Sequence, residues 1–275
     1  MDGRLRGRIV GNVMRTYVAN TLLAVSCLLT PDCGRDLDVG SDVLWSSRFE
    51  GGNFAEWTPV PFGFGNESAT APNTIEVSSE RAHQGTYAAK LTVSGTATNP
   101  GGIGSSLVQN GGLPIQAYYS AWYYLPQSVT VGVYWVIMKF RAALGDPPTQ
   151  GELFDVNLTS PSAGVMSLRL YDHRNGDLPV LDASADASAP PAVPVNAWFQ
   201  LEAFYRDADD STGHLTLWLN GKQILDWQGA TGLTTWVAWD VVSVGDKLTP
   251  EPAILYVDDC AVSRTRVGPA GLLAE

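Results

Sequence analysis

Cysteine, histidine and charge are all scarce in this chain. Of its 275 residues, three are cysteines, three are histidines and 16% are charged. Cys27, Cys33 and Cys260 form no CxxC pair and join no histidine cluster, which excludes the usual zinc sites. Two of them fall near the amino terminus, so no disulfide framework is available to the body of the chain. We expect Cys260 to be a small buried strand residue.

Basic residues are fewer than acidic ones, and long apolar runs are missing. The chain has 17 Lys and Arg against 28 Asp and Glu, a net charge of −11. A protein this acidic is a poor binder of nucleic acid or of anionic membranes. No apolar run reaches the ~20 residues that span a bilayer, and no segment has a convincing helical repeat. Hydrophobic residues nevertheless make up 45% of the chain, which excludes global disorder.

The amino-terminal segment, residues 1–39, predicts an export signal and tether. Met14 is a second plausible start, followed by a basic residue and by the short apolar run Thr21–Leu29. The sequence Ala24–Cys27, Ala-Val-Ser-Cys, resembles a bacterial lipobox, although Leu is usual where Ala24 stands. We expect a secreted or cell-envelope protein, with lipid attachment at Cys27 and simple secretion as alternatives.

The body of the chain reads as short β-strands separated by turns. Apolar residues alternate or cluster in short runs rich in β-branched and aromatic residues. The runs are Val43–Phe49, Thr74–Ser78, Tyr87–Val93, Ile103–Val108, Ala117–Leu125, Tyr134–Arg141, Leu153–Leu158, Met166–Tyr171, Trp198–Arg206, His214–Leu219, Lys222–Trp227, Trp236–Val244 and Ile254–Ser263.

So many strands predict an all-β fold, a two-sheet antiparallel jelly-roll sandwich, over residues 40–263. Residues 264–275 are expected to be a carboxyl-terminal tail. The stretch Asp182–Val195, rich in Pro, Ala and Ser, is predicted to be an exposed loop. Asn220-Gly221 between two runs predicts a type I′ hairpin turn, because both central residues of that turn need a positive φ. We expect a monomer.

Several motifs resemble carbohydrate-active proteins. Phe49–Phe54 with Trp57, Gly85–Leu91 and Leu255–Asp259 are similar to segments of bacterial carbohydrate-binding modules and jelly-roll polysaccharide lyases. The hairpin Leu215–Lys222, Leu-Thr-Leu-Trp-Leu-Asn-Gly-Lys, resembles the concanavalin A-like superfamily, nearest to heparin-lyase-I-like proteins. The resemblance implies a sandwich that engages a polysaccharide, and it is more specific for fold than for activity.

The resemblance also implies a structural calcium ion between the first and last strands. Glu50 and Asp258 are the candidate carboxylate ligands, since Ca²⁺ takes six to eight oxygens. Alternation along the last strand puts Asp258 and Asp259 on opposite faces. One of them therefore points inward or onto the rim, where an unpaired carboxylate is costly. A metal ion and a buried hydrogen-bond network are the two alternatives.

Polar residues on one face of otherwise apolar strands predict a sugar-binding groove. Lys139 alternates with Trp135 and Ile137 in one run, Asp155 shares a face with Asn157, and Arg169 shares a face with Tyr171. A solvated sheet face is the alternative. The candidate substrate-binding residues are Trp135, Asp155, Gln200, Glu202, Arg206 and Trp218.

A lyase that acts on a uronate needs a base for the C5 proton and a donor that neutralises the carboxylate. Lys139 and Tyr171 are the candidate bases. Arg169, Asn157 and Gln200 are the candidate neutralisers. Among the histidines, only His173 stands at a strand end near these residues. The function that we predict is therefore polysaccharide-lyase-like.

A retaining glucanase and a lectin-like module are alternatives to the lyase. A retaining glucanase needs two carboxylates about 5 Å apart; Glu152 and Asp155 face oppositely in a regular strand, and Asn157 stands where the acid would be, which argues against it. A lectin-like module would use aromatic stacking, for which Trp135 and Trp218 are preferred. The full aromatic set is Trp122, Tyr124, Trp135, Trp218, Trp236 and Trp239. A structural envelope protein is the third alternative.

Overall fold

The computed structural model describes residues 42–57, 67–69, 72–94, 103–110, 113–144, 149–175, 178–182, 192–232 and 237–269. The predicted export segment, with Cys27 and Cys33, lies outside the described residues, as does Trp236. Residues 38–275 form one compact unit, and the description below concerns this unit.

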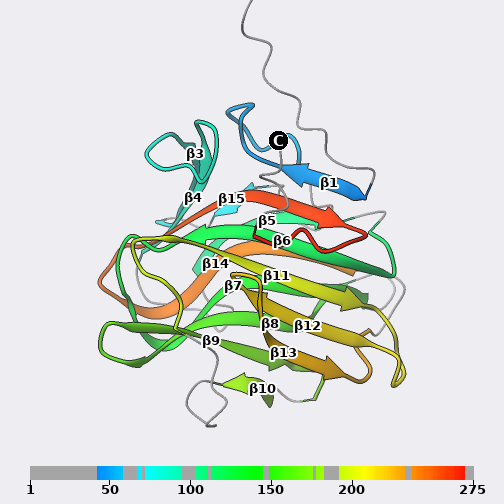
Figure 1. The fold of residues 1–275 in the computed structure, drawn as a ribbon. Coiled ribbons are helices and arrows are strands. Elements are labelled where there is room, and N and C mark those ends of the chain that lie inside the picture. Colours follow the sequence, from blue (N-terminus) through cyan, green and yellow to red (C-terminus); the bar gives the residue numbers. More distant parts are fainter. Residues whose placement is uncertain are drawn as a thin grey trace, which may run out of the picture. The chain divides into compact units, whose positions relative to one another are not determined.

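Fifteen strands and one short 3₁₀ helix make up the described part (Figure 1). They are β1 (Val43–Ser47), β2 (Glu67–Ala69), β3 (Thr74–Ser78), β4 (Ala88–Val93), β5 (Ile103–Asn110), β6 (Gln116–Tyr124), β7 (Thr130–Leu144), β8 (Thr149–Ser162), β9 (Val165–Asp172), η1 (His173–Asn175), β10 (Leu178–Asp182), β11 (Trp198–Arg206), β12 (His214–Leu219), β13 (Lys222–Gln228), β14 (Val237–Thr249) and β15 (Ala253–Ser263). No helix in these ranges is long and apolar enough to cross a membrane.

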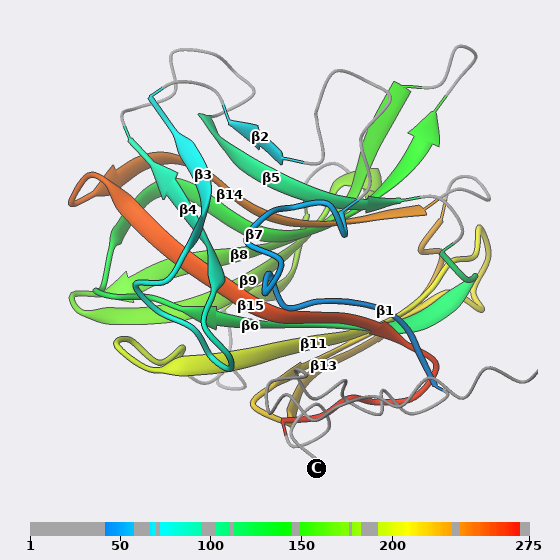
Figure 2. The same ribbon diagram turned by 90° about the horizontal axis from the view of Figure 1, so that it is seen from above.

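The strands form two antiparallel sheets that face each other, as Figure 2 shows from above. Sheet A has the order β13-β12-β11-β6-β15-β4-β3, with β1 also paired to β15. Sheet B has the order β10-β9-β8-β7-β14-β5-β2. Consecutive strands such as β5, β6 and β7 alternate between the sheets, as expected for a jelly roll. The predicted two-sheet sandwich is confirmed.

Every predicted strand is present, and two further strands appear. β2 is only three residues long, and its sequence Glu-Ser-Ala has no apolar pattern to read. β10 contains Pro179 and lies at the edge of sheet B, the place where a sheet tolerates proline. The turn at Asn220-Gly221 has φ values of 49° and 78°, which confirms the predicted hairpin geometry.

Aromatic side chains from both sheets fill the core. Phe140 of sheet B stacks on Tyr205 of sheet A with ring centroids 4.4 Å apart, and Tyr119 packs edge-on against the same Phe140. Trp239 of β14 meets Tyr119 and Trp57. These rings are almost fully buried. Burial of such large apolar surfaces is the main stabilising term of the sandwich. Cys260 is buried too, as predicted, and burial raises the pKa of its thiol.

The segment that follows β15 packs on the outer face of sheet A. Glu202 of β11 accepts hydrogen bonds from the backbone N–H groups of Val267 (2.7 Å) and Gly268 (3.2 Å), and Arg266 pairs with it at 3.0 Å. Gln200 donates to the carbonyl oxygen of Gly268 at 2.9 Å. We call residues 264–269 the C-terminal strap. It leaves Glu202 and Gln200 without exposed surface.

Candidate active site

A row of polar side chains crosses four strands on the outer face of sheet B. Lys139 of β7 lies directly opposite Asp240 of β14 on one side and Asp155 of β8 on the other. Asp155 in turn lies opposite Tyr171 of β9. Because neighbouring strands are about 4.8 Å apart, these four side chains form a continuous row.

A second row lies beside the first, where Asn157 of β8 is opposite Arg169 of β9. The core side chains Phe154, Val156 and Leu158 of β8 point the other way, which is why its intervening residues face outward. The two rows are joined, since the Nη1 atom of Arg169 donates a hydrogen bond of 2.9 Å to the Tyr171 hydroxyl. We call the outward-facing residues of β8 and β9 the polar strip.

Ion pairs hold the charged members of the first row in place. The Oδ2 atom of Asp155 lies 3.5 Å from Nζ of Lys139 and 3.2 Å from Nε2 of His173. Asp240 pairs with Nε of Arg141 at 2.6 Å. Burial raises the pKa of Asp240 to about 6, and the positive charges of Arg141 and Lys139 oppose that rise. Positive and negative groups therefore alternate along the row.

The predicted site residues divide between the two sheets. Lys139, Asn157, Arg169, Tyr171 and Asp155 come together on sheet B as one cluster. Four other candidates are Gln200, Glu202, Arg206 and Trp218, which lie on the outer face of sheet A, away from that cluster. Alternation along a strand predicts which residues share a face, but it does not predict which sheet the strand joins.

Three predicted substrate contacts need correction because the side chains are covered. Trp135 has no exposed surface; its indole N–H donates to Ser243 at 2.9 Å inside the protein. Gln200 and Glu202 are sealed beneath the C-terminal strap. None of the three can stack on or bind a sugar in this arrangement.

The error at Trp135 has a local cause. The register between β7 and β8 shifts between Val136 and Met138, which marks a β-bulge. After the bulge, Lys139 points outward although Trp135 and Ile137 point into the core. Strict alternation would have kept all three on one face.

The remaining two candidates on sheet A have different surroundings. Arg206 is exposed at the end of β11. Trp218 is largely covered by the C-terminal strap, since the guanidinium of Arg266 lies 4.3 Å from its ring centroid. Trp239 belongs to the core, whereas Trp122 is partly exposed and stacks on His83 with centroids 3.7 Å apart. Among the aromatic residues considered for a lectin, Trp122 therefore presents surface.

Two charged residues of the site were missed from the sequence. In the sequence, Arg141 stands at the end of a predicted strand, and Asp240 is one residue of an apolar run. A single carboxylate within the run Val-Ala-Trp-Asp-Val-Val is the signal that would have found Asp240, because a buried charge needs a partner. Arg141 supplies that partner from the neighbouring strand.

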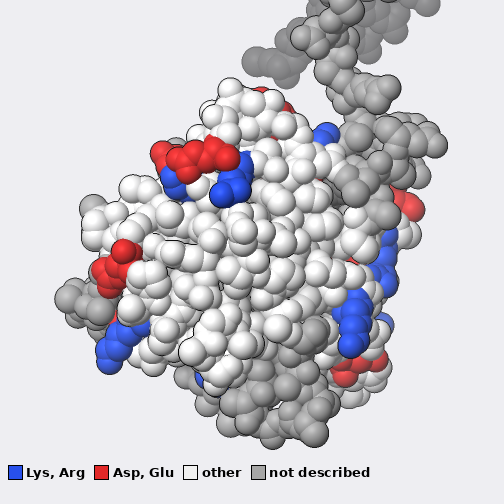
Figure 3. Space-filling view, turned by 60° about the vertical axis from the view of Figure 1, so that its left-hand side comes forward, with Lys and Arg blue, Asp and Glu red and all other residues white. Residues whose placement is uncertain are grey.

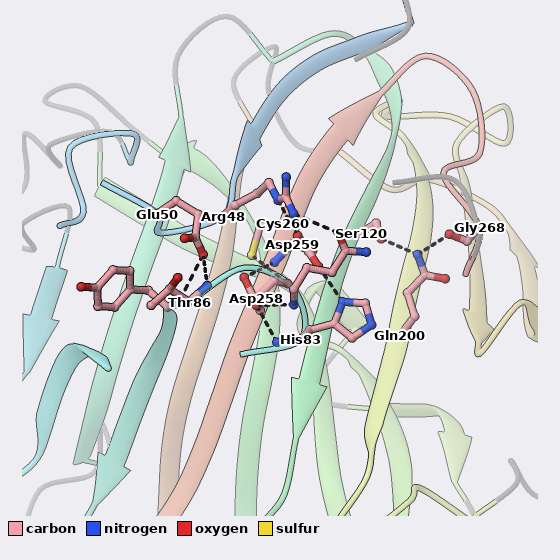
Figure 4. A network of polar contacts seen from close by, with 12 residues as sticks. Arg48, Glu50, His83, Thr86, Ser120, Gln200, Asp258, Asp259, Cys260 and Gly268 are labelled. Atoms are coloured by element: carbon pink, nitrogen blue, oxygen red, sulfur yellow. Dashed lines mark hydrogen bonds and ion pairs between the residues drawn. The ribbon is translucent and has the colours of Figure 1, made fainter. Parts of the chain in front are cut away.

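The joint between the first and last strands is held by hydrogen bonds (Figure 4). Asp258 Oδ2 accepts from the N–H groups of His83 (2.8 Å) and Gln84 (3.3 Å), and its Oδ1 accepts from Asp259 N–H (2.8 Å). Asp259 pairs with Arg48 at 3.0 Å and with His83 Nδ1 at 2.6 Å. Burial, with the adjacent Asp259 as the second cause, raises the pKa of Asp258 to about 8.

Glu50, the other predicted calcium ligand, accepts hydrogen bonds from the N–H groups of Thr86 (2.9 Å) and Tyr87 (3.1 Å) through Oε1. N–H groups therefore point at three of the carboxylate oxygens of Glu50 and Asp258. A calcium ion needs six to eight oxygens, and N–H dipoles directed at these same atoms oppose a cation. Across the described ranges no cluster of three or more His, Cys, Asp or Glu residues is placed to hold a metal ion. In this arrangement N–H groups hold both carboxylates, and calcium binding stays a prediction.

The comparisons with known proteins agree with this fold. The family model described as polysaccharide lyase matches residues 49–236. The chain belongs to the polysaccharide lyase family. The match to the lyase model includes Lys139, Asp155, Asn157, Arg169 and Tyr171 of the cluster on sheet B.

Several solved structures, lyases among them, have the same sandwich. The endo-β-1,4-glucuronan lyase from the fungus Trichoderma reesei is 16% identical, with a TM-score of 0.59 over 81% of this chain and 96% of that one. The cellulose induced protein Cip1 is 18% identical, with a TM-score of 0.54 over 81% and 98%. The marine PL-14 alginate lyase from Aplysia kurodai is 9% identical, with a TM-score of 0.52 over 81% and 99%. At these identities the likeness establishes the fold. No curated protein sequence matches the chain.

Proposed function

We propose that this member of the polysaccharide lyase family cleaves a uronate-containing polysaccharide by β-elimination on the outer face of sheet B. The observation that carries the proposal is the 2.9 Å hydrogen bond between Arg169 and the Tyr171 hydroxyl, beside Lys139 and Asn157. A base candidate and a cationic donor thus share one site, as removal of a proton next to a carboxylate requires.

The β-elimination that we propose uses neither water nor an added cofactor as a reactant. Tyr171, in its deprotonated phenolate form, takes the proton from C5 of the uronate, and the electron pair of that C–H bond forms the C4=C5 double bond. The C4–O bond to the next sugar breaks, and its oxygen leaves with the proton that Tyr171 has taken up, which restores the phenolate. Arg169 and Asn157 stabilise the negative charge that gathers on the carboxylate while C5 is deprotonated.

Lys139 is the other candidate for the base, and its contacts favour a different role. Its ammonium group lies 3.5 Å from the Asp155 carboxylate, and Asp240 stands on its other side. A charged ammonium cannot take a proton. We therefore assign Lys139 to binding the polymer and to donating hydrogen bonds, with Asp155 and Asp240 positioning it.

Localisation and assembly are part of the same proposal. A polysaccharide polymer is met outside the cytoplasm, which fits the export signal predicted from residues 1–39 and a secreted or cell-envelope protein. Lipid attachment at Cys27 is proposed as the means of retention at the envelope, and the folded unit is proposed to act as a monomer. Mass spectrometry of the mature amino terminus and sedimentation of the purified protein test both points.

The test is an ultraviolet assay for unsaturated product. The purified full chain is incubated with glucuronan, alginate, pectate, heparin and a neutral glucan, and absorbance near 232 nm is followed. A rise with one of the uronate polymers and none with the glucan supports the lyase. No rise with any polymer, together with retention on an insoluble glycan, supports the lectin-like alternative, for which the partly exposed Trp122 is the available stacking surface. Neither product nor retention supports a structural envelope protein.

A further inference from the structure

A small pocket opens at the end of the polar strip where β8 ends, beside Thr159. Tyr171 lies further back along the strip, opposite Asp155. The volume of the pocket is about 170 Å³, which suits one sugar ring and is below the ~300–1,000 Å³ of pockets for larger ligands. The lining residues are Val131, Gly132, Val133, Thr159, Ser160, Pro161 and Arg169.

The pocket is continuous with the candidate active site through one residue. Arg169 lines the pocket and also donates its hydrogen bond to Tyr171. On β8, Thr159 follows Asn157 on the same outward face, and Ser167 of β9 lies directly opposite Thr159. The polar strip therefore runs without interruption from Tyr171 to the pocket.

Oxygen atoms along this strip have no hydrogen-bond partner among the described residues. They include Oδ1 of Asn157, Oγ1 of Thr159 and Oγ of Ser167, and Asn157 and Ser167 are only 2% exposed. Most buried polar groups in folded proteins are paired, because an unpaired one costs about 1–3 kcal/mol. Of these residues Thr159 lines the pocket, so its hydroxyl is the one that a ligand rich in hydroxyl groups would meet there.

The charge and polarity of the pocket indicate which chemical class of ligand it fits. Arg169 is the one charged residue among the described residues of the lining, and Val131, Val133 and Pro161 supply apolar walls. A uronate ring combines a carboxylate, several hydroxyls and apolar C–H faces. A guanidinium pairs with a carboxylate in a charge-assisted hydrogen bond, while the apolar walls match the ring.

We propose that this pocket is a subsite for the uronate unit next to the one that loses its C5 proton, and that the glycan runs along β8 and β9 between Tyr171 and Val133. Arg169 lies between the two units and donates to the carboxylate of each through different N–H groups, since a guanidinium has five. The hydroxyls of this unit bind Thr159. The inference rests on the proposed function, and it adds the direction of the chain and a second acidic sugar to the substrate.

The test adds a negative charge to the wall of the pocket. Val133 is 48% exposed, so Val133→Glu keeps the fold, and Ile115→Glu is a matched control at an exposed position before β6 of sheet A, 73% exposed. For the polymer that is cleaved, we expect Val133→Glu to raise KM at least about tenfold with kcat within about twofold, because like charges repel. Ile115→Glu should change neither. Unchanged KM in Val133→Glu would overturn the subsite.

A binding measurement separates this inference from the lyase proposal. Titration calorimetry of the wild type with glucuronate and mannuronate tetrasaccharides should give a Kd that Val133→Glu and Thr159→Val both weaken. Reduction of the sugar carboxyls to hydroxymethyl groups should weaken binding at least about tenfold. If the tetrasaccharides bind, and the variants and carboxyl reduction weaken binding, but no unsaturated product forms, the subsite is supported and the lyase proposal is contradicted. Product formation with no effect of either variant keeps the lyase and removes the subsite. Tetrasaccharides that do not bind at all overturn the subsite.

Discussion

On β9, the guanidinium of Arg169 donates a hydrogen bond of 2.9 Å to the phenol oxygen of Tyr171, two residues further along the strand. Residues two apart share a face of the sheet, so the contact needs no special backbone geometry. It fixes the phenol oxygen beside a positive charge, in the same row as Asp155 and Lys139. The first two predictions depend on this arrangement.

Tyr171→Phe should abolish most of the proton transfer. General-base catalysis contributes about 10²–10⁴-fold, so kcat should fall at least about 100-fold while KM and the melting temperature stay close to those of the wild type. Steady-state kinetics by ultraviolet absorbance measures this effect. Tyr118→Phe, on the outer face of sheet A, is the matched control and should retain full activity. A Tyr171→Phe variant with wild-type kcat would remove this residue as the base.

Lys139→Met keeps the length of the side chain and removes its charge. If Lys139 binds the polymer, as proposed, KM should rise about tenfold with a smaller loss of kcat. The pH profile of kcat should keep its shape, because the proton acceptor is still present. A loss of kcat as large as that of Tyr171→Phe, with KM unchanged, would instead make Lys139 the base.

Glu202→Gln should weaken the attachment of the C-terminal strap. The Glu202 carboxylate is fully buried and accepts two backbone N–H groups in addition to its pair with Arg266. Hydrogen bonds to a charged group contribute about 1.5–3 kcal/mol, so the free energy of unfolding should fall by about 2 kcal/mol in a urea titration. Glu76→Gln is the control, since its surface pair with Lys90 spans 3.6 Å and it should lose less than about 0.5 kcal/mol. Equal stabilities of the two variants would mean that the strap contributes little.

Asp240 should make stability depend on pH. Burial raises its pKa from 3.8 to about 6, so the folded state holds this proton more tightly than the unfolded state. The bound proton of Asp240 therefore adds to the free energy of unfolding, on the order of 3 kcal/mol. This contribution is complete below about pH 4 and is lost as the pH rises through about 6. Asp207, whose pKa burial also raises to about 6, acts in the same direction. Asp240→Asn does not titrate, so its unfolding free energy should fall less than that of the wild type between pH 4 and 6. If plots of unfolding free energy against pH were parallel for the wild type and Asp240→Asn, Asp240 would not be the group that causes the pH dependence.

Calcium is tested at the joint between Glu50 and Asp258. A bound ion stabilises the folded state by RT ln(1 + [Ca²⁺]/Kd), so millimolar calcium should raise the melting temperature and a chelator should lower it. Glu50→Gln should remove the difference. A melting temperature that responds to neither calcium nor chelator would mean that the hydrogen bonds of Figure 4 hold this joint without an ion.

The sequence predicted the strands, and it predicted which residues of β8 and of β9 share a face, because both depend on local alternation. Asp155 and Asn157, like Arg169 and Tyr171, kept the faces that alternation assigns. Alternation gave the wrong result at Trp135, because a β-bulge changes which residues of β7 face outward. It also gave the wrong result at Glu202, because a contact with a distant part of the chain buries this side chain. No local pattern predicts that residues 264–269, read as a tail, cover a glutamate of β11. The sheet to which each strand belongs is likewise a property of the whole chain.

Charges of both signs are interspersed over the described residues visible in Figure 3, and no expanse of basic residues appears among them on that face. In the row on sheet B, Lys139 stands between Asp240 and Asp155, so its field is largely cancelled a few ångströms away. At longer range a polyanion meets the net charge of −11. Added salt shortens the Debye length to about 10 Å at 0.1 M and screens this repulsion. Encounter with the polymer should therefore become faster as ionic strength rises from dilute buffer, the reverse of what strongly basic polyanion-binding proteins do.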